Sequence, residues 1–179
     1  MDRVKLKQEI LDFTIKGVSS FLKKNSKLEF YAFAYDCNAE YAEINLCFNT
    51  LFDFEKTLDY YQNGQFGQNF KSDEDIRDLK YNTGDWEYQC FETISILSDD
   101  ELNDIFNGFP DEDDDKSWNE FVESLMELFC ECLLEFRDTL TFKSIPKSKD
   151  FVYFCIDHDE DLKIAEERLV QIENKLNKK

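Results

Sequence analysis

The segment between Trp118 and Leu140 constrains the fold more than any other part of the 179-residue chain. Its apolar residues recur at intervals of three and four, which is the spacing of one face of an α-helix. Ser117 and Glu120 form a capping-box pattern that predicts where this helix begins. The opposite face carries four glutamates spaced four residues apart: Glu123, Glu127, Glu131 and Glu135. Because like charges at this spacing repel one another, burial of the apolar face must stabilise the helix.

Aromatic-rich runs elsewhere in the chain predict the sheet against which this helix packs. The runs 30–35 and 41–48 flank a break rich in Asp and Asn, an arrangement typical of an antiparallel hairpin. The run 151–156 is apolar throughout, as expected of a central strand buried on both faces. We therefore expect an α+β fold, in which a small, mostly antiparallel sheet (hairpin 30–48 plus strand 151–156) is packed by amphipathic helices.

Further amphipathic stretches complete the expected fold. The spacing of apolar residues predicts helices over 4–22, 51–62, 98–106 and 162–176. Residues 86–91 suit a short strand, whereas the stretch 64–83 contains two glycines and mixed charge and is expected to be a long loop. The chain has no internal repeat and no long flexible linker, so we expect a single domain over residues 1–179.

The charge of the chain is unevenly distributed. The formal net charge is −19, with 40 acidic and 21 basic residues. Residues 29–135 hold 28 acids and five bases, a net charge of −23, whereas residues 1–28 hold seven bases and three acids, a net charge of +4. This excess of acids argues against binding to a nucleic-acid backbone or to an anionic membrane surface, because both need clusters of Lys and Arg. It favours a basic protein partner and speeds the encounter with one.

The N-terminus and the cysteines favour a cytoplasmic protein. The first residues lack the uninterrupted apolar stretch of a secretory signal, and no window is apolar enough to span a membrane. The six cysteines are therefore expected to be reduced core thiols, among which Cys37 and Cys47 could approach each other across the predicted hairpin. Since the chain has no C-x-x-C motif, the spacing predicts no zinc site, and we expect no cofactor.

The acidic stretches do not match known catalytic or metal-binding motifs. Asp157-x-Asp159-x-Asp161 has Leu162 where a calcium loop needs glycine, and the run from Asp111 fails in the same way. Helix capping and solvated acids are the simpler interpretation of both stretches. The single histidine, His158, has no nucleophile motif to serve, so we expect no enzyme. One enzymatic alternative stays open, a hydrolase that uses Asp157, His158 and Asp159 with a divalent ion.

Several short motifs together resemble a known family. They are Glu29–Tyr35, the strand that ends in Cys47-Phe48-Asn49-Thr50, the stretch Gly84-Asp85-Trp86-Glu87-Tyr88, the long amphipathic helix and Phe151–Asp157. In this order they resemble the bacterial family named domain of unknown function 4303 over most of the chain, with departures at the acidic insert around Asp111 and across 64–80. The resemblance implies an α+β domain and no particular activity. In size and acidity the chain is also similar to immunity proteins that neutralise bacterial toxins.

We expect an acidic binding protein that neutralises a basic partner, as an immunity protein does when it inhibits a toxin nuclease. Its carboxylates would replace substrate phosphates against Lys and Arg of the toxin, with an aromatic side chain as an apolar anchor. The candidate partner-binding residues are Asp99, Asp100, Glu101, Asp104, Asp111, Glu112, Asp113, Asp114, Asp115, Trp118, Glu123, Glu127, Trp86 and Tyr88. For the aromatic residues, core packing is the competing interpretation. A further alternative is a DNA mimic that regulates a nucleic-acid-binding protein.

Overall fold

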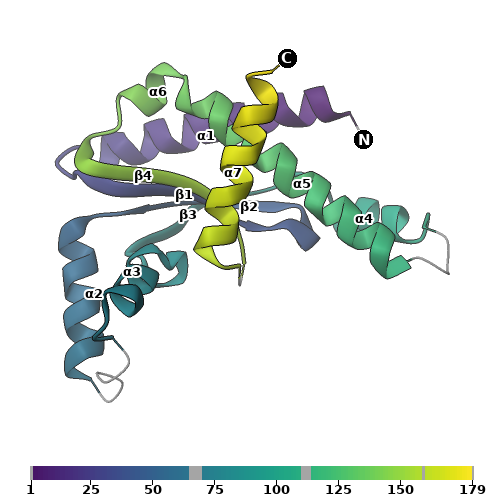
Figure 1. The fold of residues 1–179 in the computed structure, drawn as a ribbon. Helices are drawn as coiled ribbons and strands as arrows, with labels where there is room; N and C mark the ends of the chain where they lie inside the picture. The colour runs from purple at the N-terminus through teal and green to yellow at the C-terminus, as the bar shows by residue number, and fades with distance from the viewer. Residues whose placement is uncertain (1, 65–69, 110–113, 159, 179) are drawn as a thin grey trace.

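The computed structural model describes residues 2–64, 70–109, 114–158 and 160–178. Its centre is a four-stranded sheet in the order β3-β2-β1-β4 (Figure 1). The strands are β1 Phe30–Asn38, β2 Glu43–Asn49, β3 Tyr88–Ser95 and β4 Lys147–Asp157. The pairs β1–β2 and β2–β3 are antiparallel, whereas β1 and β4 run parallel. The predicted α+β class and the mostly antiparallel sheet are therefore confirmed.

Helices cover the sheet within the described residues. The α-helices are α1 Arg3–Lys24, α2 Leu51–Asn63, α3 Asp73–Tyr81, α4 Asp99–Phe106, α5 Asp114–Arg137, α6 Leu140–Lys143 and α7 Leu162–Leu176, and the 3-10 helices are η1 Ala39–Tyr41 and η2 Thr83–Asp85. Except for α3 and α6, each of these α-helices matches a stretch predicted to be helical. No helix among the described residues is long and apolar enough to cross a membrane.

The structure corrects the predicted bounds of the long helix. It begins at Asp114, so Ser117 lies inside α5 and does not cap it. It ends at Arg137 rather than at Leu140. The reason is that the Thr139 side chain accepts a hydrogen bond from the backbone N–H of Phe142 and starts the separate helix α6.

The stretch 64–83, expected to be a loop, contains the helix α3. The Ser72 hydroxyl accepts a hydrogen bond from the backbone N–H of Asp75, and the Asp75 carboxylate accepts one from the backbone N–H of Ser72. This reciprocal capping satisfies two backbone donors that the first helical turn leaves free. The Ser-x-x-Asp pattern was the local signal for this helix, and the loop prediction overlooked it.

The sheet separates two hydrophobic clusters. On one face, α1 and α5 pack against strand residues that include Phe33 and Phe48. On the other face, residues of α2 and α3 pack around Tyr31, Trp86 and Phe154. In Figure 1, α2 and α3 lie on the opposite side of the sheet from α1.

The position of β4 differs from the prediction. β4 is an edge strand, whereas β1 lies inside the sheet and is buried along its length except at Asn38. The helix α7 packs against β4 and contributes Ala165 to one cluster and Leu169 to the other, so the edge is covered. This cover explains why an edge strand has an apolar sequence. Because β1 and β4 are parallel, they end at the same edge of the sheet, and the residues that follow them meet there.

Candidate functional site

Most of the sequence-predicted acids lie at one end of the molecule. We call α4 and the first part of α5, up to Glu123, the α4–α5 lobe; in Figure 1 it extends beyond the sheet. Asp99, Asp100, Asp104 and Asp115 are exposed there and form no ion pair with the described residues. Glu101 accepts a hydrogen bond from the backbone N–H of Ser98 at 2.8 Å, in the predicted capping box. Asp111, Glu112 and Asp113 lie outside the described residues, and Asp114 is described only as the first residue of α5.

An aromatic group lies among these acids. The half-buried ring of Trp118 packs edge-on against Phe106, with ring centroids 5.5 Å apart, and also contacts Phe121. Phe106 is 41% exposed. Trp118 therefore packs partly against the core, as the competing interpretation expects, and partly forms an aromatic surface within the α4–α5 lobe.

The row of glutamates on α5 is largely neutralised from within the protein. The ion pairs are Glu127 with Lys175 at 2.9 Å, Glu131 with Arg3 at 3.1 Å and with Lys7 at 3.5 Å, and Glu135 with Lys7. Of the four glutamates, only Glu123 is exposed with no ion pair to the described residues. The four glutamates therefore do not form a continuous face of unpaired carboxylates, because α1 and α7 supply basic side chains to this row, and Glu127 as a partner-binding residue stays a prediction.

The two aromatic candidates outside the lobe belong to the core. Trp86 is 2% exposed, and its Nε1–H donates a hydrogen bond to the backbone carbonyl of Lys80 at 2.9 Å. Tyr88 is half-buried and packs edge-on against Phe21 and Phe30. Trp86 is thus not presented to a partner in this structure, since its ring fills the cluster between the sheet, α2 and α3.

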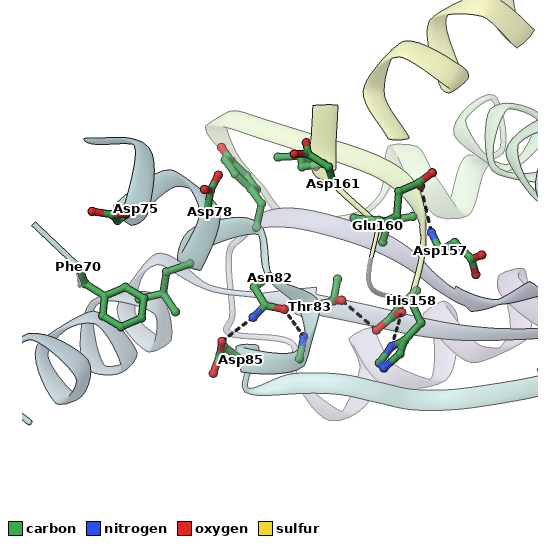
Figure 2. Close-up of a pocket in the computed structure, with 16 residues that line it drawn as sticks. Phe70, Asp75, Asp78, Asn82, Thr83, Asp85, Asp157, His158, Glu160 and Asp161 are labelled. Atoms are coloured by element: carbon green, nitrogen blue, oxygen red, sulfur yellow. Dashed lines mark hydrogen bonds and ion pairs between the residues drawn. The ribbon is translucent and has the colours of Figure 1, made fainter. Parts of the chain in front are cut away.

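A second acidic region is a pocket of about 470 Å³ at the edge where β1 and β4 end (Figure 2). This volume lies in the range of small-ligand pockets. The described lining includes one histidine and seven carboxylates, and it includes no Lys or Arg. The acids are Asp36, Asp75, Asp78, Asp85, Asp157, Glu160 and Asp161. A cationic group is therefore the ligand that this pocket favours electrostatically.

Asp36 is a buried carboxylate in the lining of the pocket. Its Oδ2 accepts a hydrogen bond from the Thr83 hydroxyl at 2.9 Å, and its Oδ1 lies 4.0 Å from Nδ1 of His158. Burial raises the pKa of Asp36, although the Thr83 hydrogen bond and the nearby His158 oppose the shift. His158 is 66% exposed, so its ring faces solvent at the mouth of the pocket.

The acids that follow β4 have structural partners. Asp157 accepts a hydrogen bond from the backbone N–H of Ala39 at 3.0 Å. Glu160 pairs with Arg168, and Asp161 caps α7, which confirms the helix-capping interpretation for Asp161. Asp159, the third residue of the hydrolase alternative, lies outside the described residues.

The structure also assembles a cluster that sequence spacing missed. The Sγ atoms of Cys47 and Cys90 and a carboxylate oxygen of Asp36 all lie within 4.8 Å of one another. Because the three residues come from three different strands, β2, β3 and β1, no short sequence motif predicts that they meet. The expected approach of Cys37 to Cys47 is wrong, because the two side chains belong to clusters on opposite faces of the sheet. Cys37 instead lies 3.7 Å from Cys155, measured between the sulfur atoms.

Comparison with known proteins identifies one relationship. A family model described as Domain of unknown function (DUF4303) matches residues 10–176. No curated protein and no solved structure matches the chain. The match spans the sheet, the pocket and the α4–α5 lobe.

Proposed function

The chain belongs to this family, whose description names no activity, and we propose from its surfaces that it is a binding protein that neutralises a basic protein partner. The proposed partner is a toxin domain of the nuclease class, and the proposed role is that of an immunity protein. One observation carries the proposal: the α4–α5 lobe holds exposed carboxylates that have no ion pair to the described residues, and it also holds the partly exposed Phe106–Trp118 pair.

The contrast between two parts of α5 supports this assignment. In the second half of the helix, Glu127, Glu131 and Glu135 pair with basic side chains of α1 or α7. In the described part of the lobe, Glu120 pairs with Lys116 at 3.9 Å, whereas Asp99, Asp100, Asp104, Asp115 and Glu123 have no ion pair. Unpaired like charges destabilise a fold, so a cluster of them is more useful in binding a cation than in stability.

The proposed mechanism is occlusion. Nucleases hold the phosphates of their substrates with Lys and Arg, so a surface of carboxylates can take the place of the phosphates. The charges would speed the encounter, and aromatic rings such as Phe106 and Trp118 would slow dissociation by burying apolar surface at the centre of the contact.

A charge-reversal experiment tests the proposal. The gene directly upstream is first read for a large secreted protein with a variable C-terminal domain, and that domain is then expressed in bacteria with or without this chain. The test variant is Asp104→Lys/Glu123→Lys, and the matched control is Glu55→Lys/Glu167→Lys, which changes the net charge equally at exposed helical positions outside the lobe. We expect the test variant to bind at least roughly tenfold more slowly at low salt and to protect poorly, and the control to behave as wild type.

Two outcomes would contradict the proposal. If the wild-type chain neither binds the domain nor protects the cells, the immunity role is wrong for this partner. If both double variants lose binding equally, only the net charge matters and the lobe is not the interface. Competition by duplex DNA for the same surface of a nucleic-acid-binding protein, without protection from a toxin, would instead favour the DNA-mimic alternative.

A further inference from the structure

Three side chains with metal-binding atoms converge on the sheet face that carries α2 and α3. Cys47 comes from β2, Cys90 from β3 and Asp36 from β1, and their ligand atoms lie within 4.8 Å of one another. Asp36 and Cys47 are buried, whereas Cys90 is exposed. The cluster is thus preformed inside and open to solvent on one side.

The backbone of β3 is distorted where it supplies Cys90. The register between β2 and β3 shifts between Leu46 and Phe48, opposite Cys90. Cys90 has a φ of 47°, in the left-handed region that residues other than glycine rarely occupy. Its backbone N–H donates a hydrogen bond to the Cys47 sulfur at 3.2 Å. A bulge of this kind re-aims a side chain, and strained backbone is commonly kept where function requires it.

We propose that Asp36, Cys47 and Cys90 form a binding site for a soft divalent cation, Zn²⁺, whose fourth coordination position is open to solvent. Zn²⁺ takes thiolate sulfur at about 2.3 Å and carboxylate oxygen at about 2.0–2.2 Å, commonly with tetrahedral geometry. Ligand atoms on such a tetrahedron lie about 3.5–3.8 Å apart. The ligand atoms, which lie within 4.8 Å of one another, therefore need to close by about 1.3 Å at most, and rotation of the exposed Cys90 side chain can shorten its own distances to the other two ligands.

The surroundings of the three ligands support a metal site. The Thr83 hydroxyl holds Oδ2 of Asp36 at 2.9 Å and so fixes the orientation of the carboxylate. The backbone N–H of Cys90 donates a hydrogen bond to the Cys47 sulfur and favours negative charge on it, although the Cys90 side chain and burial raise the pKa of Cys47 overall in the metal-free protein. Hydrogen bonds of this kind, one step removed from the metal, are typical of zinc sites, where they orient the ligands. Two sulfur ligands select Zn²⁺ over Mg²⁺ or Ca²⁺, which prefer oxygen.

This site is independent of the α4–α5 lobe, so either proposal can fail without the other. Metal binding is measured on the reduced, full-length chain by competition between the protein and a chromogenic zinc chelator. Co²⁺ added in place of Zn²⁺ provides a second readout, because thiolate ligands give Co²⁺ a charge-transfer absorption that oxygen ligands do not.

Three variants distinguish the loss of a metal ligand from the loss of a residue that orients a ligand. Cys90→Ser removes an exposed ligand with little risk to the fold, and we expect it to weaken Zn²⁺ binding at least roughly 100-fold and to reduce the Co²⁺–thiolate absorption. Thr83→Val removes only the hydroxyl that orients Asp36, and we expect it to weaken Zn²⁺ binding roughly 10- to 100-fold while the thiolate absorption persists. The matched control Cys132→Ala removes a buried thiol of the opposite-face cluster and should bind Zn²⁺ as wild type does.

We expect one Zn²⁺ per wild-type chain. The proposal is overturned if the reduced wild-type chain takes no Zn²⁺ from the chelator. It is also overturned if Cys90→Ser binds Zn²⁺ as tightly as Cys132→Ala does. If the Cys47 and Cys90 thiols disappear together on mild oxidation and the reduced protein binds no metal, the pair is a disulfide couple and not a zinc site.

Discussion

Replacing Lys7 with methionine tests whether ion pairs between α1 and α5 stabilise this acidic protein. Lys7 lies on α1 and reaches two glutamates of α5: its Nζ is 3.5 Å from Glu131, and it also donates a hydrogen bond to Glu135. Its side chain is 22% exposed, so water screens these interactions only in part. Methionine keeps an unbranched stem and a good helix propensity, so Lys7→Met removes the charge and leaves most of the packing.

The magnitude follows from the two contacts and their exposure. Solvent-exposed ion pairs contribute about 0.2–1 kcal/mol each, and partial burial places the Lys7 pairs near the upper end. We therefore expect Lys7→Met to lower the free energy of unfolding by about 1.5 kcal/mol. For a chain of this size, that corresponds to a fall of about 3–6 °C in Tm.

The pH dependence has a definite sign. Burial opposes the charge on Lys7, but the hydrogen bond to Glu135 and the charges of Glu135 and Glu131 outweigh it, so the pKa of Lys7 is raised. A lysine with a raised pKa in the folded state stabilises the protein fully below its unfolded pKa, and this contribution is lost as the pH rises through the folded pKa. The difference between wild type and Lys7→Met should therefore persist at neutral pH and shrink in strongly alkaline solution.

Thermal and urea unfolding at low salt and at 1 M salt measure the effect. The control is Lys16→Met, because Lys16 is exposed on the same helix and its loss changes the net charge equally. If both variants lose the same stability, general repulsion explains the effect and the specific pairs do not. If the loss in Lys7→Met is unchanged at 1 M salt, where charges are screened within about 3 Å, lost packing is the cause and the electrostatic reasoning is refuted.

Three further predictions concern the pocket and its neighbours. Asp36→Asn should raise the free energy of unfolding at pH 7. Because burial raises the pKa of Asp36, the stability of the wild-type protein falls as the pH rises above 3.8, the ordinary pKa of an aspartate. A variant with a lower Tm than wild type at pH 7 would contradict this prediction. In the reduced, metal-free protein, the hydrogen bond from Cys47 lowers the pKa of Cys90 to about 7. Alkylation should therefore occur first at Cys90, and its rate should reach half of its maximum near pH 7. Cys47→Ala should move this half-maximal pH upward. Trp86→Phe removes the hydrogen bond to Lys80 and should cost about 1–2 kcal/mol in urea unfolding, so an unchanged midpoint would show that this bond contributes little.

Local patterns predicted the elements of the fold because their signals lie within one helix or strand. The periodicity between Trp118 and Leu140 identified α5, and the two aromatic runs identified β1 and β2. The place of β4 in the sheet was not predictable in the same way. An apolar run shows that both faces of a strand are covered, but it does not distinguish neighbouring strands from a helix such as α7, which covers the edge.

The candidate sites also differ in whether their signal is local in the sequence or depends on long-range contacts. The acids of the α4–α5 lobe lie close together in the sequence, so counting charges along the chain revealed their concentration. The grouping of Asp36, Cys47 and Cys90 depends on strand order, register and a bulge. None of these three features can be predicted from a short stretch of the sequence. The pairing of Glu131 with bases of α1 likewise depends on how two distant helices pack.

The ion pairs between α1 and α5 show that the negative charge is neutralised unevenly along α5. The basic first helix is placed against the acidic second half of α5, so Arg3 and Lys7 offset repulsion where the helix crosses the core. In the described part of the lobe this relief is only partial, because Glu120 pairs with Lys116 whereas Asp100 and Asp104 are exposed and have no ion pair to the described residues. If solubility alone had selected the acids, there would be no reason to neutralise Glu127, Glu131 and Glu135 in one half of α5 and leave Asp115 and Glu123 without ion pairs in the described part of the other. The uneven neutralisation therefore favours a binding surface at the lobe, and an external cation is the group that would complete it.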